Sequence, residues 1–180
     1  MTCIAGIAEG GSVYLAGDSA GCAGWDLSVR GDPKVFANGP YVIGFTSSFR
    51  MGQLLRYSFS PPSPEADLHR FMCTAFIDAL RTCLKDGGWA SKDKEQEEGG
   101  TFLIGVAGAL FRICDNYQVG IPASGFDAVG CGGQIANGAM FATAGKKPLA
   151  RLETAMQAAE RLSAGVRGPF SYVSMPPEAS

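Results

Sequence analysis

Two short apolar runs at the start of the chain restrict the possible folds most strongly. Cys3 to Ala8 and Val13 to Ser19 each have the length of a strand, and only Glu9-Gly10-Gly11-Ser12 separates them. Two such runs joined by a Gly-containing turn are typical of a β-hairpin. Because the strands of a hairpin run antiparallel, its outer ends, at Thr2 and Asp18, are expected at the same edge of a sheet.

More strands and a helix are predicted after this hairpin. Residues 21–31 are expected to form a loop that carries Trp25. Lys34 is expected to open a third strand, directly after a proline, and Tyr41 to Thr46 has the apolar character of a fourth strand. Phe49 to Tyr57 has apolar residues at helical spacing, which predicts a helix packed on the sheet.

The second half of the chain alternates between helical and strand patterns. Leu68 to Leu84 has the pattern of a long amphipathic helix that ends at Gly87-Gly88, and the charged run Ser91 to Glu98 is expected to be a solvated loop. The remaining runs predict strands at Thr101–Ala107, Ala109–Cys114, Tyr117–Ile121, Asp127–Gly130 and Phe170–Ser174, and helices at Gln134–Ala142 and Arg151–Ala164.

The order of these elements favours an α+β fold. Groups of strands alternate with groups of helices, which differs from the strict βαβ alternation of a parallel sheet. Most positions of the predicted strands are apolar, so each sheet is expected to be buried on both faces. A four-layer αββα sandwich, formed as one domain by residues 1–180, meets both conditions.

Composition excludes several classes of function. The net charge is −2 and the pI is about 5.4, so the chain has no electrostatic basis for binding nucleic acid or anionic membranes. The six cysteines are scattered, and His69 is the only histidine, so neither a metal site nor another cofactor is expected. No run is long enough to span a bilayer, and no basic, apolar leader opens the chain. We therefore expect a cytoplasmic protein with reduced thiols.

The N-terminus carries a candidate nucleophile. Removal of Met1, which is usual before a small residue, leaves Thr2 with a free α-amine beside its own hydroxyl. Such an amine titrates near neutral pH and is a known base for a threonine hydroxyl. Asp18 follows sixteen residues after Thr2, and Lys34 sixteen residues after Asp18. If Lys34 joins the hairpin edge, the three residues form one site.

An N-terminal Thr, a Gly-Asp at this distance and a Lys-Val opening the next strand resemble the proteasome β-subunits. They resemble still more closely the bacterial HslV-type peptidases, which belong to the N-terminal-nucleophile hydrolases. The resemblance continues along most of the chain, in three segments. Val42 to Ser48 resembles the strand and loop that line that family's substrate cleft. Thr101 to Cys114 resembles its central hairpin, and Ala128 to Gly133 resembles its G-S-G-G helix start. A bacterial or phage-type proteasome-like protein is therefore expected.

The resemblance implies a role for each candidate residue. Thr2 is the nucleophile, Asp18 holds Lys34 as the ammonium, and Lys34 places positive charge beside Thr2. Thr46, Ser47 and Ser48 would line the cleft, with the N–H groups near the two serines receiving the oxyanion. Cys131 stands where the family has a serine that orients the amine.

The sequence also departs from the family. The run Ser47-Ser48-Phe49-Arg50 replaces a glycine-rich cleft loop, and its bulkier side chains narrow the cleft or alter its specificity. The family's helper aspartate before the last strand has no equivalent in Arg161 to Arg167, where Ser163 is the nearest polar group.

Three functions are consistent with these residues. The first is a threonine peptidase acting on peptides or unfolded proteins, which the resemblance implies to be a homo-oligomeric ring that works with an ATPase unfoldase. The second is a ring-forming scaffold or binding protein with weak or no activity. The third is an amidohydrolase that uses Thr2 on small amides.

Overall fold

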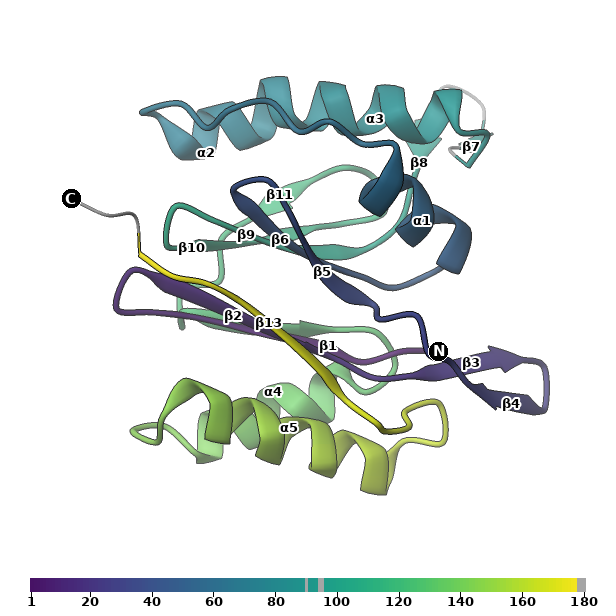
Figure 1. The fold of residues 1–180 in the computed structure, drawn as a ribbon, viewed down its shortest axis with the longest axis vertical. Helices are drawn as coiled ribbons and strands as arrows, with labels where there is room; N and C mark the ends of the chain where they lie inside the picture. Colours follow the sequence, from purple (N-terminus) through teal and green to yellow (C-terminus); the bar gives the residue numbers. More distant parts are fainter. Residues whose placement is uncertain (90, 94–95, 178–180) are drawn as a thin grey trace.

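The computed structural model of the chain describes residues 1–89, 91–93 and 96–177. It combines helices with antiparallel sheets, as the element order predicts (Figure 1). One sheet has four strands in the order β12 (Phe126–Val129), β1 (Ile4–Glu9), β2 (Ser12–Gly17) and β13 (Ser171–Met175). The other has five, in the order β11 (Val119–Gly120), β10 (Ala109–Ile113), β9 (Phe102–Val106), β6 (Tyr41–Phe45) and β5 (Val35–Asn38).

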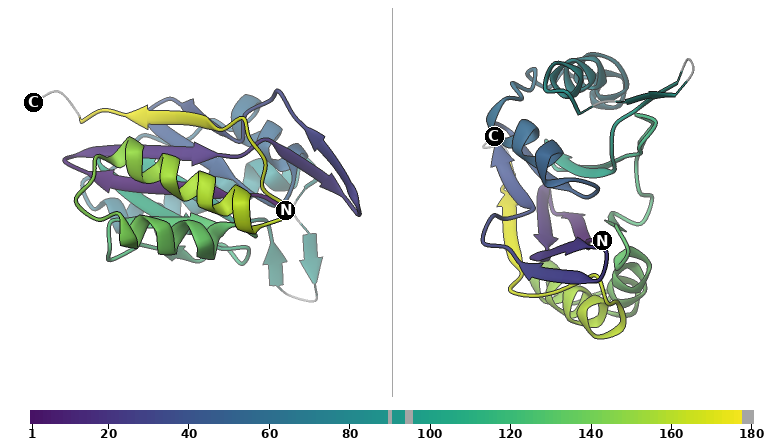
Figure 2. Two further views of the ribbon diagram at one scale, coloured as in Figure 1. Left: turned by 90° about the horizontal axis from the view of Figure 1, so that it is seen from below. Right: turned by 90° about the vertical axis from the view of Figure 1, so that its right-hand side faces the viewer.

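Helices cover the outer face of each sheet, as Figures 1 and 2 show. Above the five-stranded sheet lie α1 (Phe49–Tyr57) and a long helix, whose segments are α2 (Leu68–Phe71), a π-helical stretch (Met72–Phe76) and α3 (Ile77–Asp86). Below the four-stranded sheet lie α4 (Gly133–Ala142) and α5 (Pro148–Leu162).

Successive side chains of each strand point to alternate faces of its sheet, and the core is therefore divided into three clusters. Ile4, Leu15 and Leu103 belong to the cluster between the sheets. Ala5 and Ala16, their neighbours in the chain, face α4 and α5 instead. The third cluster joins the five-stranded sheet to the helices above it. Because successive side chains of a strand point to opposite faces, both sheets bury both of their faces.

Most predicted elements are observed within one to three residues of their expected ends. The hairpin pairs Ile4 with Gly17 and Glu9 with Ser12, so its outer ends do meet at one edge. Lys34 lies directly before β5 rather than inside it. The segment expected at Tyr117–Ile121 shortens to β11, and α5 begins at Pro148, since proline is favoured in the first turn of a helix.

Two expected loops were wrong. Residues 21–31 contain a second hairpin, formed by β3 (Ala20–Ala23) and β4 (Asp26–Val29), which extends beyond the body of the protein (Figure 1). Polar and apolar residues do alternate along β4, but all four residues are exposed, so neither face of the strand is buried against the core. The charged run contains two short paired strands, β7 (Ser91–Asp93) and β8 (Gln96–Glu98), and its residues 94–95 lie outside the described residues.

Candidate active site

Backbone pairing places Thr2, Asp18 and Lys34 at the same sheet edge. Thr2 precedes β1, Asp18 follows β2, and Lys34 precedes β5 of the other sheet. The pairing of β1 with β2 continues one step beyond the strands, because the Asp18 N–H donates to the Cys3 carbonyl at 3.2 Å. The Cys3 N–H donates in turn to Asp18 Oδ1 at 2.9 Å. The strand ends thus fix the Asp18 carboxylate next to Thr2.

Lys34 joins Asp18 to Thr2. Its Nζ donates to Asp18 Oδ1 at 2.7 Å, to the Ala20 carbonyl at 2.7 Å and to Thr2 Oγ1 at 3.2 Å. An ammonium has three N–H donors, so these three acceptors satisfy it completely. Both charged side chains are almost fully buried. The arrangement therefore directs a desolvated positive charge at the Thr2 hydroxyl.

The Asp18 carboxylate is equally well satisfied. Oδ2 accepts from the Ala20 N–H at 2.9 Å and from the Arg167 N–H at 3.3 Å. A buried ion pair is tolerated only when such additional hydrogen bonds complete it. The segment between α5 and β13, in which the sequence offers no helper aspartate, thus reaches the site through a backbone N–H. No sequence pattern could reveal that contact, since every residue except proline has the same N–H.

Cys131 and the glycines beside it surround the backbone of Thr2. The Thr2 N–H donates to Cys131 Sγ at 3.3 Å, and the thiol lies 3.5 Å from the Thr2 carbonyl oxygen, to which it donates. Ser163 Oγ donates to the same sulfur at 3.5 Å. Gly130 has a φ of +92°, and a Cβ there would lie 2.2 Å from the Thr2 carbonyl oxygen. Only glycine fits at this position.

Met1 is present at the site. The Thr2 hydroxyl donates to the Met1 carbonyl, and the Met1 side chain lies against Gly165, where an added Cβ would approach it to 2.5 Å. With Met1 attached, the Thr2 nitrogen is a peptide amide without a lone pair available for a proton. The base that the chemistry requires therefore exists only after Met1 is removed.

The loop before α1 forms the facing wall. Thr46 is buried and its hydroxyl donates to the Thr101 carbonyl at 2.9 Å. Ser47 is exposed and has a φ of +67°, a conformation that favours glycine. The Ser48 N–H donates to the Thr46 carbonyl at 2.8 Å, so in this arrangement it is already engaged. The Ser47 N–H has no hydrogen-bond partner among the described residues.

A cleft of about 60 Å³ separates Thr2 from this wall. Thr2, Lys34 and the three loop residues line it, whereas Asp18 and Cys131 support it from behind. Met1 and Phe49 also border it. Ala20 and Cys22, from the start of the projecting hairpin, also line it, and no sequence pattern marked these two residues.

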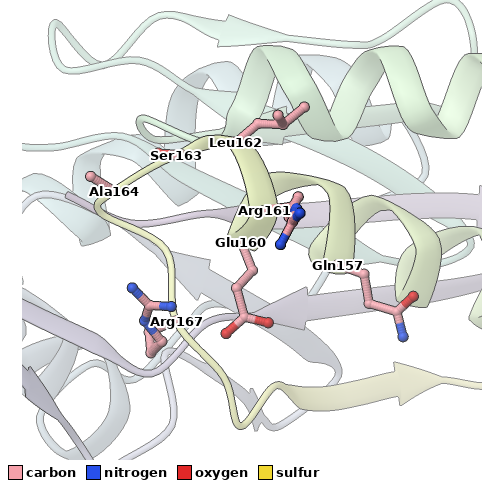
Figure 3. Close-up of a pocket in the computed structure, with 7 residues that line it drawn as sticks. All are labelled: Gln157, Glu160, Arg161, Leu162, Ser163, Ala164 and Arg167. Atoms are coloured by element: carbon pink, nitrogen blue, oxygen red, sulfur yellow. The ribbon is translucent and has the colours of Figure 1, made fainter.

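A larger hollow of about 570 Å³ lies at the C-terminal end of α5 (Figure 3). Gln157, Glu160, Arg161 and Arg167 surround it, and Glu160 Oε1 accepts the Gly168 N–H at 2.9 Å. Ser163 and Arg167 connect it to the contacts of Cys131 and Asp18, but Thr2 and Lys34 do not line it, so the Thr2 hydroxyl does not face this hollow.

Cys3, next to Thr2 in the chain, is not an alternative nucleophile. Its side chain is fully buried. Burial, together with the nearby Asp18 carboxylate, raises the pKa of the Cys3 thiol to about 12. A thiol with this pKa stays protonated at neutral pH and does not react as a thiolate.

The described part of the chain shows neither a cluster of metal ligands nor a membrane-spanning helix. No group of three or more His, Cys, Asp or Glu residues there is arranged to hold a metal ion. Among the same residues, no helix has the length and apolar character required to cross a bilayer.

No protein-family model and no curated protein matches the sequence. Solved structures do match the fold. BPH from Thiobacillus denitrificans has a TM-score of 0.82 at 20% identity, and the match covers 99% of this chain and 100% of that protein. The complex of the same BPH with epoxomicin has a TM-score of 0.80 at 20% identity, and the match covers 98% of this chain and 100% of that protein. HslV from Trypanosoma brucei has a TM-score of 0.69 at 20% identity, over 96% of this chain and 98% of its own. Anbu, an ancestral beta-subunit from Yersinia bercovieri, has a TM-score of 0.66 at 15% identity, and the match covers 98% of this chain and 82% of that protein.

The protein has a proteasome-like fold. The similarity covers nearly the whole chain, in agreement with a resemblance that the sequence carries along most of its length. At 20% identity or less, it establishes the proteasome-like fold alone.

Proposed function

We propose that the protein is a threonine peptidase of the N-terminal-nucleophile type, built as a four-layer αββα sandwich in one domain. The observation that carries this proposal is the 3.2 Å contact between Lys34 Nζ and Thr2 Oγ1, held by the 2.7 Å ion pair with Asp18. Its substrates would be peptides or unfolded protein segments. The epoxomicin complex of Thiobacillus denitrificans BPH, a similar structure, supports peptide-like ligands for this fold.

The proposed reaction begins once Met1 is removed. The Thr2 hydroxyl attacks the carbonyl carbon of the scissile peptide bond, and its proton passes to the Thr2 amine, directly or through one water. Lys34 stabilises the developing alkoxide by its charge. The oxyanion is received by N–H donors of the loop, for which the Ser47 N–H is free.

The intermediate then collapses, and the peptide C–N bond breaks as the leaving amine takes the proton from the Thr2 ammonium. An ester between the acyl group and Thr2 remains. Water attacks this ester, with the amine again accepting a proton, and releases the carboxylic acid and free Thr2. Cys131 would orient the amine throughout, since its sulfur already lies 3.3 Å from the Thr2 nitrogen.

Exposed apolar residues support assembly into a homo-oligomeric ring. Trp25, Leu27 and Val29 are all exposed on the β3–β4 hairpin. Contiguous apolar side chains on a surface usually mark an interaction site. A ring would cover them and restrict access to the cleft, which makes an ATPase unfoldase a plausible partner. We place this ring in the cytoplasm because the six cysteines are all unpaired thiols.

A ring-shaped scaffold with weak activity is the second candidate. The observation that favours it is that the segment between α5 and β13 reaches Asp18 through the backbone N–H of Arg167 and offers no helper aspartate. The thiol of Cys131 also hydrogen-bonds more weakly than a hydroxyl would. A protein that keeps Met1 would have neither a base nor an accessible nucleophile.

Intact mass measurement followed by labelling with epoxomicin separates these candidates. We expect the purified protein to lack the mass of Met1 and to gain one equivalent of epoxomicin, with the adduct on Thr2 and none in Thr2→Ala. A retained Met1 would overturn both hydrolase proposals. A free Thr2 that reacts with neither epoxomicin nor peptide substrates would leave the scaffold, and turnover of small amides alone would favour an amidohydrolase.

A further inference from the structure

The ring of Phe49 is a partition between three hollows around the candidate nucleophile. It borders the cleft beside Thr2, a second hollow of about 60 Å³ reaching Asp32 and Arg56, and a third of about 270 Å³ under the β3–β4 hairpin. As the first residue of α1, Phe49 is held at this point by the helix that follows. The space open to a ligand beside Thr2 therefore depends on where this ring lies.

Arg30 holds the ring in place. Its guanidinium carbon lies 3.9 Å from the centre of the Phe49 ring, which is the geometry of a cation–π contact. The same guanidinium is fixed by two hydrogen bonds to Asp32, both of 2.8 Å. The Arg30 N–H also donates to the Ser19 carbonyl at 2.9 Å, next to Asp18. Phe49 is thus clamped from the side of the hairpin.

The other aromatic wall of the cleft is locked by packing. Phe45 is buried, and its ring meets the ring of Phe49 edge-on at 5.9 Å and 81°. It occupies the place of the missing side chain of Gly52, where an added Cβ would lie 2.2 Å from two of its ring atoms. Phe45 therefore cannot withdraw, whereas Phe49 is only half-buried. Of the two rings, Phe49 alone decides whether the first two hollows are separate or joined.

The volume of the cleft limits what fits beside Thr2. About 60 Å³ accommodates roughly four to six water-sized groups, at about 10–15 Å³ each. The scissile carbonyl takes some of this space. A nucleophile attacks the carbonyl of the residue on the acyl side of the bond, so the side chain of that residue must lie in the same cleft. An aromatic ring exceeds the space that remains, whereas a methyl or hydroxymethyl group fits.

We propose that Phe49, clamped by Arg30 and Asp32, is the specificity-determining residue of this site and restricts the acyl-side residue of the substrate to a small side chain such as Ala or Ser. This inference rests on the proposed peptidase function and adds its substrate class. Removal of Met1 widens the cleft on the side of the Thr2 amine but leaves the two aromatic walls in place.

Binding of peptides to a variant that cannot hydrolyse them tests the role of Phe49 separately from catalysis. Tripeptides with a free carboxylate, identical except for a C-terminal Ala, Leu or Phe, are titrated by NMR into the Thr2→Ala variant. We expect the Ala peptide to bind at least tenfold more tightly than the Phe peptide. Adding Phe49→Ala should reduce this ratio to about one or reverse it, because the first two hollows then join.

Two further variants complete the experiment. Arg30→Gln removes the clamp without emptying the core, and should lower the Ala-to-Phe ratio several-fold; it decides the matter if Phe49→Ala does not fold. Phe141→Ala removes an exposed ring on α4 and should leave the ratio unchanged. A ratio insensitive to both cleft variants, or no binding of any of the peptides, would overturn the inference. Normal binding ratios without hydrolysis by the unmodified protein would count against the peptidase proposal alone.

Discussion

The Lys34 ammonium lies 3.2 Å from the Thr2 hydroxyl oxygen. Lys34 is buried, and its only charged partner among the described residues is Asp18. Because no solvent screens this charge, its effect on a developing alkoxide is larger than that of an exposed lysine.

Lys34→Ala should reduce the kcat/KM for peptide hydrolysis by a factor of about 100 or more, the usual effect of removing one group that stabilises the transition state. It should also destabilise the fold by about 3–5 kcal/mol, since Asp18 would be left buried without its partner. Asp18→Asn combined with Lys34→Met removes both charges and should recover much of the stability without recovering turnover. Hydrolysis rates and urea unfolding measure the two effects, and unchanged turnover in Lys34→Ala would exclude Lys34 from the mechanism.

Gly130→Ala should displace Thr2. Its side chain would collide with the Thr2 carbonyl and adopt a left-handed φ of +92°, at a strain of about 1–3 kcal/mol. We expect a lower melting temperature and loss of epoxomicin labelling. Gly138→Ala is the matched control, because a Cβ there meets nothing within 4 Å and alanine favours the helix by about 1 kcal/mol. Full labelling of Gly130→Ala would contradict the role given to the glycine.

Cys131→Ser should raise kcat about three- to tenfold, because a hydroxyl both donates and accepts hydrogen bonds better than a thiol. Cys131→Ala should lower it, since the Thr2 nitrogen would lose its side-chain partner. The pH profile of kcat tests this role of Cys131. Substitution of a residue that orients the amine should shift the part of the profile that reflects protonation of the Thr2 amine. Equal rates in the serine and alanine variants would show that Cys131 does not position the amine.

Stability should fall above pH 9. The pKa of the Cys3 thiol is raised from 9.0 to about 12, first by burial and then by the Asp18 carboxylate. Below pH 9 both the folded and the unfolded chain keep this proton, so the contribution of Cys3 is complete. Above pH 9 the unfolded thiol loses its proton while the folded one keeps it, and the free energy of unfolding drops by about 1.4 kcal/mol per pH unit until about pH 12.

Measurements between pH 9 and 10 exclude Tyr41, because burial raises its pKa from 10.0 to about 12 and Tyr41 contributes only above pH 10. Burial also raises the pKa of the Cys83 thiol from 9.0, so Cys83 contributes to the slope in this range. Cys3→Ala should therefore make the slope of unfolding free energy against pH shallower without abolishing it. Cys73→Ala, which removes an exposed thiol, should not. The same slope in all three proteins would refute the assignment.

Much of the fold was predictable from local patterns. Strands that are buried on both faces, such as β1, β6 and β9, are continuous apolar runs, and the amphipathic spacing of α3 and α5 identifies one face of each helix. The β3–β4 hairpin was missed because it is paired mainly with itself and packs little against the core, so no burial pattern marks it.

The sequence by itself determined that Thr2 and Asp18 meet, because an antiparallel hairpin of fixed register returns the chain to its starting edge. Tertiary structure alone decided the rest of the site. Lys34 comes from the other sheet, the Arg167 N–H from the segment before the last strand, and the Arg30 clamp on Phe49 from a projecting hairpin. The spacing and the family resemblance indicated Lys34, but the contact itself depends on how the two sheets stack. The contacts of Arg167 and Arg30 use a backbone N–H and packing, and neither leaves a pattern in the order of the residues.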